Sequence, residues 1–521
     1  MKVLTTSPGE NINPWIIATA VMLSTFMEVL DTTVVNVSLP HIAGSLSASV
    51  DEATWTLTSY LVANAVILPI TGWLAGYLGR KRLLIMAIAG FTMASVFCGL
   101  APNLVSLIVF RIIQGACGGC LQPISQSVLL ESFPPEGRGK AMAFWGLGIV
   151  VAPMLGPVLG GWLTDSYSWR WIFYINVPVG VASIIMTEFF VFDPSYIRRM
   201  SERIDYWGIG MLALGVAALQ IVLDKGQEAD WFSSHWITAL TVISVIALVT
   251  LVIYELRVGH PVLDLRVFRV RTYSTGVFLM AIMGVVLYGS LVLLPILLQT
   301  LLGYPALNAG IAMFPRGLGS FLMMPVVGAI MTRFDARKLL GAGIVGCAAS
   351  LFLLGTLNLE IGYWNIFWAQ FLQGASLAFL FVPLTTVTMD PIPRETMGNA
   401  TSIFNLMRNL GASMGIAAVT TLVARNEQSN TTVLVSHVAP GSPQARATME
   451  MLRRGFQAGG SDAVTAGRRA YIAMFGLVEK QAAMLSFNHT FWLLGILFLF
   501  MLPLTLLMKK PTQHSGKVAV H

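Results

Sequence analysis

Residues 68–84 read LPITGWLAGYLGRKRLL, an apolar run that contains three glycines and ends in a cluster of basic residues. Residues 324–340 read MPVVGAIMTRFDARKLL and repeat this pattern, with Gly328 in the place of Gly72 and a basic pair before the final leucines. Repeats related without inversion are typical of membrane transporters in which an axis along the membrane normal relates two halves. The sequence therefore predicts two related halves.

A second echo supports this prediction further along the chain. RIIQGA at 111–116 resembles QFLQGA at 370–375. These segments fall in the fourth and the twelfth of the apolar segments described next. Six spans per half, with two spans inserted between the halves, explain a repeat that is eight spans apart.

The composition places the chain in a membrane, because 55% of its residues are hydrophobic and only 11% are charged. A helix needs about 20 apolar residues to cross a bilayer, whereas an outer-membrane barrel would show alternating segments of about ten residues. We expect an all-α polytopic membrane protein with fourteen spans, near 15–39, 53–77, 83–100, 104–130, 141–163, 172–192, 206–223, 236–255, 273–299, 306–331, 339–357, 363–389, 398–423 and 489–508.

Lys and Arg gather in alternate loops, which predicts the orientation because short cytoplasmic loops carry the excess of basic residues. The loops of the other side hold only Arg170 and Lys225 among their short segments. Both termini are therefore expected in the cytoplasm. The net charge of +7 is then a sign of topology and not of nucleic-acid binding. The basic side holds Lys2, Arg80, Lys81, Arg82, Arg138, Lys140, Arg198, Arg199, Arg203, Arg257, Arg266, Arg269, Arg271, Arg333, Arg337, Lys338, Arg394, Lys509, Lys510 and Lys517.

The expected organisation is a six-helix half at 1–200, an inserted helix pair at 201–257 and a second six-helix half at 258–521. The first span is too long for a cleaved signal, and we expect it to remain as an anchor. A soluble-looking stretch at 424–488 separates the last two spans on the extracytoplasmic side. Its helical periodicity suits amphipathic helices, which either meet a partner or pack on the transporter itself.

Charges at membrane depth are costly and point to function. Asp31 lies nine residues before Pro40, and Arg111 lies nine residues after Pro102, so both are about 13 Å below the outer end of their helices. The two side chains can pair if their helices face one cavity. The pair either holds two helices together or carries protons, with Glu28 one turn away as a second proton carrier or as part of a cation-favouring site.

Five further polar residues are candidates for substrate contacts. Asn36 continues the polar face of Glu28 and Asp31, and Gln114 and Gln126 share the polar face of Arg111. Arg316 and Arg408 each lie about eleven residues into a span. The two arginines either meet an anionic substrate group or donate to backbone carbonyls at a kink.

The segment 148–161 is dense in glycine and proline, with candidate gating residues at Pro153, Gly156, Pro157, Gly160 and Gly161. Small residues allow close helix packing and proline introduces a kink. The segment therefore serves either packing alone or bending during gating.

The four cysteines all fall within spans, and CGGC at 117–120 has no second cysteine pair or histidine beside it. Close packing therefore explains this motif better than a metal or redox site. We expect no metal, no cofactor and no catalytic residue, because the chain also lacks a nucleophile with a neighbouring base.

These motifs resemble the major facilitator superfamily, and within it the fourteen-span drug:proton antiporters of the EmrB/QacA type. GWLAGYLGRKR at 72–82 resembles the signature that locks the cytoplasmic side, which implies gating roles for Gly72, Gly79, Arg80 and Lys81. It departs from that signature at Gly76, where the family usually has Asp. SWRWIFYINVPVG at 168–180 is similar to the start of the family's sixth span.

Three more motifs resemble signatures of the antiporters. They are LDTTVVNVSLP at 30–40, RIIQGACGG at 111–119 and GPVLGG at 156–161, and they imply proton coupling through Asp31 and Arg111. LDKGQEADWFSS at 223–234 is closer to the EmrB branch. That branch implies a bacterial inner-membrane pump that works with a periplasmic adaptor and an outer-membrane channel.

The resemblance and the residues together favour a proton-driven exporter of hydrophobic or amphipathic toxic compounds, with the proton gradient as its energy source. The 28 Phe and 26 Met suit a broad apolar site, although most of them must face lipid. One alternative is a proton-coupled transporter of a single metabolite, fatty acid or siderophore. Another is a membrane enzyme or sensor that transports nothing.

Overall fold

The computed structural model describes residues 13–193, 205–259, 261–331, 333–438 and 442–508. Within these residues the chain is helical, and fourteen helical segments are long and apolar enough to cross a membrane. This confirms the predicted fold class. Seven of the predicted basic residues lie outside the described residues, namely Lys2, Arg198, Arg199, Arg203, Lys509, Lys510 and Lys517. The predicted boundary near residue 200 lies there too, and the domain division stays a prediction.

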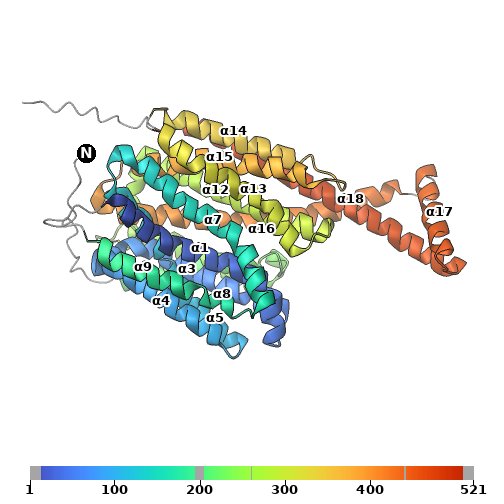
Figure 1. The fold of residues 1–521 in the computed structure, drawn as a ribbon, viewed down its shortest axis with the longest axis horizontal. Coiled ribbons are helices and arrows are strands. Elements are labelled where there is room, and N and C mark those ends of the chain that lie inside the picture. The colour runs from blue at the N-terminus through green and yellow to red at the C-terminus, as the bar shows by residue number, and fades with distance from the viewer. Residues whose placement is uncertain (1–12, 194–204, 260, 332, 439–441, 509–521) are drawn as a thin grey trace, which may run out of the picture.

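The elements follow the order of the predicted spans (Figure 1). The first six spans are built from α1 (Pro14–Ser45), α2 (Val50–Ala53), α3 (Trp55–Leu78), α4 (Arg80–Leu100), α5 (Leu104–Gly118), α6 (Leu121–Ser132), α7 (Arg138–Ser166), α8 (Trp171–Tyr174) and α9 (Asn176–Phe190). The inserted pair is α10 (Tyr206–Lys225) and α11 (His235–Glu255). The second half contains α12 (Arg271–Ile296), α13 (Ala306–Ile330), α14 (Ala336–Leu354), α15 (Tyr363–Met389), α16 (Met397–His437), α17 (Pro443–Ala458), α18 (Ala463–Leu499) and α19 (Met501–Thr505).

Short turns connect several of these helices. They are η1 (Pro135–Gly137), η2 (Trp231–Ser233), η3 (Leu265–Arg269) and η5 (Arg394–Thr396), together with a π-helical turn, η4 (Leu297–Leu301), that ends α12.

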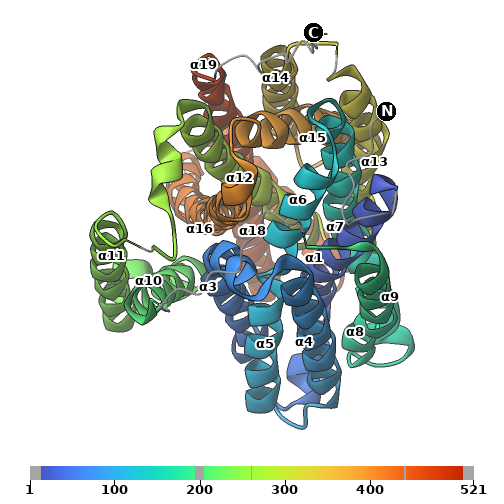
Figure 2. The same cartoon turned by 90° about the vertical axis from the view of Figure 1, so that its left-hand side faces the viewer.

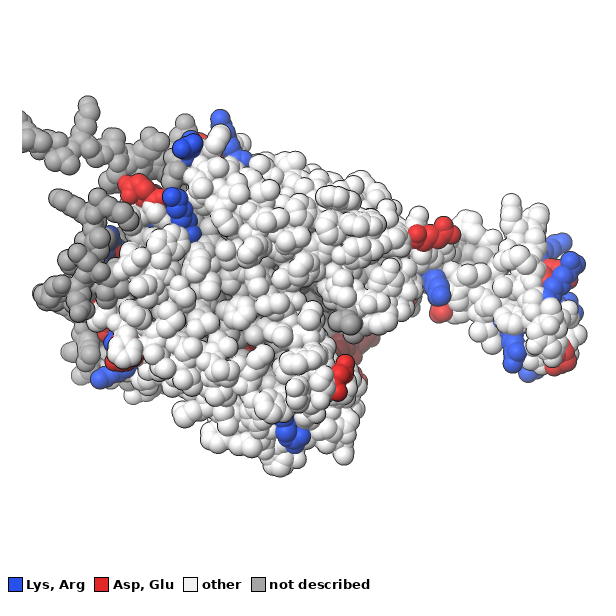
Figure 3. Space-filling view, viewed as in Figure 1, with Lys and Arg blue, Asp and Glu red and all other residues white. Residues whose placement is uncertain are grey.

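The bundle has two ends. We call the end at which α1 begins the terminal end, and the end from which α18 projects the hairpin end (Figure 1). On the face shown in Figure 3, Lys, Arg, Asp and Glu lie toward these two ends and leave a broad uncharged band between them. An uncharged band is what contact with lipid requires, because an exposed charge in hydrocarbon is costly.

The predicted repeat is visible as a shared packing contact. A Cβ on Gly115 of α5 would collide with the backbone oxygen of Tyr60 on α3, and a Cβ on Gly374 of α15 would collide with that of Arg316 on α13. Both glycines belong to the repeated QGA motif. Each half therefore uses the same small residue to bring two helices close.

Three predicted spans are not single helices, and one of them, 489–508, breaks at Phe500 between α18 and α19. The predicted span 104–130 breaks between α5 and α6, where a Cβ on Gly119 would lie 2.6 Å from the backbone oxygen of Asn64. The predicted span 172–192 breaks at Ile175, between α8 and α9. Hydropathy does not register these breaks, because both sides of each break are apolar.

The stretch at 424–488 is helical, as its periodicity predicts, but its helices are not separate from the last two spans. Helix α16 continues to His437 and α18 begins at Ala463, so the last two spans extend into a projecting hairpin with α17 across its tip (Figure 1). The two arms meet where Asn430 Nδ2 donates to Ser486 Oγ at 2.9 Å. Hydropathy predicts only the part of a helix that lies in lipid, whereas the backbone hydrogen bonding of α16 and α18 continues beyond it.

The inserted pair lies to one side of the bundle, beside α3 (Figure 2). Its helix α10 contacts both halves. Asp224 accepts a hydrogen bond from Thr58 of α3, and Gln220 Nε2 donates to Ser413 Oγ of α16 at 2.7 Å. The pair therefore spans the junction between the halves.

Candidate functional site

Asp31 and Arg111 form a fully buried ion pair between α1 and α5. Arg111 Nη1 lies 2.5 Å from Asp31 Oδ2, and neither side chain is exposed. The pairing that equal depth predicted is therefore present. A buried pair of this kind is costly to desolvate and needs further hydrogen bonds to its remaining atoms.

Two amides supply those bonds to Asp31. Gln114 Nε2 donates to Asp31 Oδ1 at 3.0 Å, and Asn176 Nδ2 donates to the same oxygen at 2.7 Å. Asn176 is the first residue of α9, directly after the break at Ile175. Sequence reasoning missed Asn176, and its only signal was a lone amide in an otherwise apolar segment of the motif at 168–180.

Arg111 is held in place on several sides. Its Nε donates to the backbone oxygen of Thr56 at 3.1 Å, and its Nη1 donates to Gln114 Oε1 at 2.8 Å. Its guanidinium carbon lies 4.2 Å from the centre of the Tyr60 ring, a cation–π contact. The planar guanidinium therefore fits a preformed cradle that an ammonium group cannot fill in the same way.

Glu28 has a different environment one turn along α1. Asn64 Nδ2 donates to its Oε1 at 3.1 Å, and Gln122 Nε2 donates to its Oε2 at 2.5 Å. Gln122 Oε1 accepts in turn from Arg408 Nη2 on α16. Glu28 thus reaches a cation of the second half through one amide.

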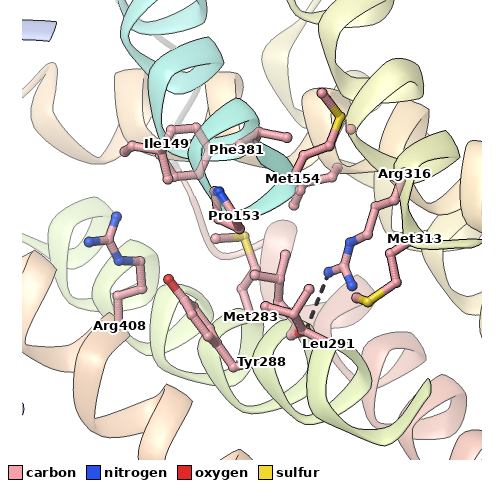
Figure 4. Close-up of a pocket in the computed structure, with 14 residues that line it drawn as sticks. Ile149, Pro153, Met154, Met283, Tyr288, Leu291, Met313, Arg316, Phe381 and Arg408 are labelled. Carbon is pink, nitrogen blue, oxygen red and sulfur yellow. Dashed lines mark hydrogen bonds between the residues drawn. The ribbon is translucent and has the colours of Figure 1, made fainter. Parts of the chain in front are cut away.

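A cavity lies between the two halves (Figure 4). Its lining atoms surround about 760 Å³ of space, part of which is open to solvent. Most of the lining is apolar and rich in Met, with Tyr288, Arg316 and Arg408 as its polar members. The apolar lining includes Ile149, Val150, Pro153, Met154, Met283, Met313, Leu377 and Phe381.

Arg316 and Arg408 enter this cavity from different helices (Figure 4). Arg316 is buried, and its Nη2 donates to the backbone oxygen of Leu287 at 3.3 Å. Its Nη1 has no hydrogen-bond partner in the part of the chain that the structure describes. None of the described residues that line the cavity is acidic.

The other three candidate substrate contacts do not line this cavity. Gln114 is occupied in the Asp31–Arg111 pair. Gln126 Oε1 accepts from Asn405 Nδ2 at 2.6 Å, which joins α6 to α16 across the halves. Asn36 is exposed on α1. Its side chain points away from the buried face because five residues rotate the helix by about 140° more than one full turn beyond Asp31.

The glycines of α7 serve mainly close packing against α1. A Cβ on Gly156 would collide with the Thr33 side chain, and one on Gly160 would lie 2.9 Å from the backbone oxygen of Val34. A Cβ on Gly161 would meet nothing within 4 Å. Pro153 lines the cavity, whereas a Cβ on Gly310 of α13 would lie 3.8 Å from Pro157.

The signature residues cluster at the terminal end of the bundle. Arg80 pairs with Glu131, and Lys81 Nζ lies 3.4 Å from Glu188 Oε1. Gly79 has φ +88°, a conformation that favours glycine, and Asp193 Oδ1 accepts from the Lys81 backbone N–H beside it at 2.8 Å. These contacts stay within the first half.

The two halves also meet at this end. A Cβ on Gly72 of α3 would lie 2.7 Å from the backbone of Asn399 on α16. Arg138 Nη1 of α7 lies 3.7 Å from Asp390 Oδ1, just after α15. The terminal side of the cavity is therefore closed by contacts between the halves.

A metal centre has no support in the described part of the chain. No group of three or more His, Cys, Asp or Glu side chains there is arranged to hold a metal ion. The cysteines of the CGGC motif are free, and the Cys117 sulfur would lie 2.6 Å from a Cβ on Gly90. Close packing accounts for the CGGC motif.

Comparison with known proteins identifies the architecture. The family model described as "Major Facilitator Superfamily" matches residues 21–416. The chain belongs to this superfamily. Its fold agrees with two solved transporters, the proton:xylose symporter XylE (TM-score 0.58, 16% identity, 94% of each chain) and the human organic anion transporter MFSD10 (TM-score 0.56, 14% identity, 94% of this chain and 100% of that one). It is a multi-pass membrane transporter.

Similarity to named proteins indicates the branch of the superfamily to which the chain is related. The transporter is 39% identical to the multidrug export protein EmrB of Haemophilus influenzae, over 95% of this chain and 96% of that protein. It is 37% identical to EmrB of Escherichia coli over 98% of both. It is 38% identical to the fatty acid resistance protein FarB of Neisseria gonorrhoeae, over 95% of this chain and 96% of FarB. The predicted family is confirmed.

Proposed function

We propose that this transporter is a proton-driven antiporter that exports hydrophobic or amphipathic toxic compounds across the bacterial inner membrane. The observation that carries the proposal is the combination of a buried Asp31–Arg111 pair in one half with an apolar cavity between the halves. The similarity to multidrug exporters supports it.

The pair supplies a means of binding and releasing a proton. Arg111, Gln114 and Asn176 each donate one hydrogen bond to the Asp31 carboxylate, and donors of this kind favour a carboxylate over the neutral acid. If a change within the first half withdraws Arg111 or Asn176, the carboxylate loses those contacts at membrane depth and takes a proton. Rocking of one half against the other around the central site gives each side of the membrane access in turn.

The cavity favours apolar compounds, and among them those that carry an anionic group. Flexible Met side chains adapt to ligands of different shape. Arg316 and Arg408 provide buried positive charge with no acidic residue among the described lining residues. The second candidate function is transport of one fatty acid or similar metabolite, which the relationship to a fatty acid resistance protein favours.

The proposed topology places both termini in the cytoplasm and the hairpin of α16 to α18 in the periplasm. The relatives in the EmrB branch and the projecting hairpin support a tripartite assembly with a periplasmic adaptor and an outer-membrane channel. In this arrangement the contacts of Gly72 and Arg138 with the second half close the cytoplasmic side, Arg80 and Lys81 brace the first half there, and the prolines Pro153 and Pro157 of α7 take part in gating.

Uptake into proteoliposomes with an imposed pH gradient tests this function. The probes are ethidium, a hydrophobic anionic dye and radiolabelled oleate. Gradient-driven transport of several unrelated probes supports multidrug antiport, with anionic probes favoured, while transport of oleate alone supports the second candidate. Uptake that persists unchanged after the gradient is collapsed refutes proton coupling.

A further inference from the structure

The Gln122 side chain connects Glu28 of the first half with Arg408 of the second. Its Nε2 donates to Glu28 Oε2 at 2.5 Å, and its Oε1 accepts from Arg408 Nη2. Only one orientation of the amide satisfies both partners, because the nitrogen can only donate and the oxygen can only accept. The orientation of the Gln122 amide therefore depends on whether Glu28 needs a hydrogen-bond donor or an acceptor.

The surroundings of Glu28 define that requirement. The titratable or charged groups that face it are Asp31 on α1, Tyr60 on α3 and Arg408 on α16. Its hydrogen-bond partners are the amide nitrogens of Asn64 and Gln122. Both partners donate, which suits a carboxylate that can only accept.

A proton on Glu28 changes this requirement. The proton arrives from the aqueous phase and forms an O–H bond on the carboxyl group, which must then donate to an acceptor. Glu28 is only 5% exposed, so an O–H without an acceptor there would carry the full desolvation cost of a buried donor. The Gln122 oxygen becomes that acceptor if the amide turns over.

Turning the amide has a consequence in the other half. The Gln122 nitrogen would then face the Arg408 guanidinium, and two donors cannot bond to each other. We propose that Gln122 is the coupling residue that converts the protonation of Glu28 into loss of the Arg408 bond between the two halves. This inference rests on the proposed proton-driven cycle and adds a positioning role for a residue outside the Asp31–Arg111 pair.

The bond between Gln122 and Arg408 lies where the two halves meet. Arg408 lines the cavity, and α6 meets α16 at two further hydrogen bonds toward the terminal end, Asn405 to Gln126 at 2.6 Å and Thr401 to the backbone oxygen of Pro123 at 3.2 Å. Gln126 lies one turn from Gln122 and bonds across the halves without touching Glu28. It is therefore a matched control.

Distances between the halves test the proposal without any substrate. Spin labels are placed on the exposed positions 82 and 334 at the terminal end, in full-length protein whose native cysteines are replaced by serine. Double electron–electron resonance spectroscopy in nanodiscs then measures how the distribution of distances between the two labels changes from acid to alkaline pH. We define the response of Glu28 as the part of the pH-dependent change in these distances that is lost in the Glu28→Gln variant.

We expect Gln122→Met to remove this response and Gln126→Met to keep it. A full response in Gln122→Met, an equal loss in Gln126→Met, or no response of Glu28 at all would overturn the proposal. If Gln122→Met fails to fold, Arg408→Met removes the same bond from the other side, and a retained response there overturns the proposal equally. Absence of gradient-driven uptake by the wild type in proteoliposomes would instead refute the proposed function, while the distances still report on Gln122.

Discussion

A single amide at position 176 contributes to how firmly Asp31 is held in its ionised form. A hydrogen bond to a charged group contributes about 1.5–3 kcal/mol. Asn176→Ala removes such a bond, at 2.7 Å. We therefore expect the pH profile of gradient-driven transport to move to higher pH, because the carboxylate loses a donor that the neutral acid does not need.

The control for this substitution is Ser95→Ala. Asn176 also donates to Ser95 Oγ at 3.0 Å, so the serine variant disturbs the same amide without removing its bond to Asp31. A pH profile that moves equally in both variants, or in neither, would contradict the assignment of Asn176.

Substitution of Arg111 distinguishes between two roles of its ion pair with Asp31, a static contact between helices and a part in proton coupling. Arg111→Lys keeps the charge but loses the Nε bond to Thr56 and the second contact to Gln114. We expect gradient-driven uptake to fall at least roughly tenfold, as 1.4 kcal/mol lost from the coupled step would give. Asp31→Asn is expected to abolish coupling altogether. Full activity of the lysine variant would favour a static pair that only joins two helices.

At the scale of elements, α7 and α1 are held together by residues too small to replace. Gly156→Ala places a methyl group against the Thr33 side chain, whereas Gly161→Ala meets open space on the same helix. Overpacking of this kind costs about 1–3 kcal/mol. We expect a lower melting temperature in detergent for the first variant only, and equal melting temperatures would show that α1 and α7 adjust freely.

The start of α18 depends on a charged cap. Hydrogen bonds from Thr465, through its side chain and its backbone N–H, hold the pKa of Asp462 below its usual range. Because this pKa is lowered in the folded state, the cap is fully stabilising above the ordinary Asp value of about 3.9 and is lost as the pH falls through the folded value. Hydrogen exchange at Val464 and Thr465 should therefore be slow near neutral pH, after correction for intrinsic rates. Asp462→Ala should expose both amides at every pH, and unchanged protection would show that the cap is unnecessary.

Prediction from sequence succeeded where hydropathy and the geometry of a regular helix decide the outcome. The fourteen spans follow from hydropathy, and the Asp31–Arg111 pair follows from equal depth on two helices. It failed where packing between elements decides. The bond from Asn176 to Asp31 requires the break before α9, and the path from Glu28 through Gln122 to Arg408 requires the halves to be docked.

The same limit applies to the whole molecule, whose most prominent feature is the projecting hairpin. About 26 residues of α18 precede the predicted last span, which corresponds to roughly 39 Å of helix. Several large apolar side chains on this arm remain exposed, including Tyr471 at 70% and Ile472 at 72%. Exposed apolar side chains of this size at helical spacing are typical of a surface that a partner covers.

The hairpin therefore yields the prediction that separates transport from assembly. Replacing Tyr471, Ile472 and Phe475 of α18 by serine removes exposed apolar surface without touching the cavity or the Asp31–Arg111 pair. We expect this variant to lose binding of the proposed periplasmic adaptor while gradient-driven uptake in proteoliposomes stays at the wild-type level. The matched variant replaces Val433 and Val435 on the α16 arm by serine and should keep adaptor capture if the α18 face is the docking surface. Capture by both variants would place the adaptor elsewhere, and lost uptake in the α18 variant would show that the hairpin supports the transport cycle itself.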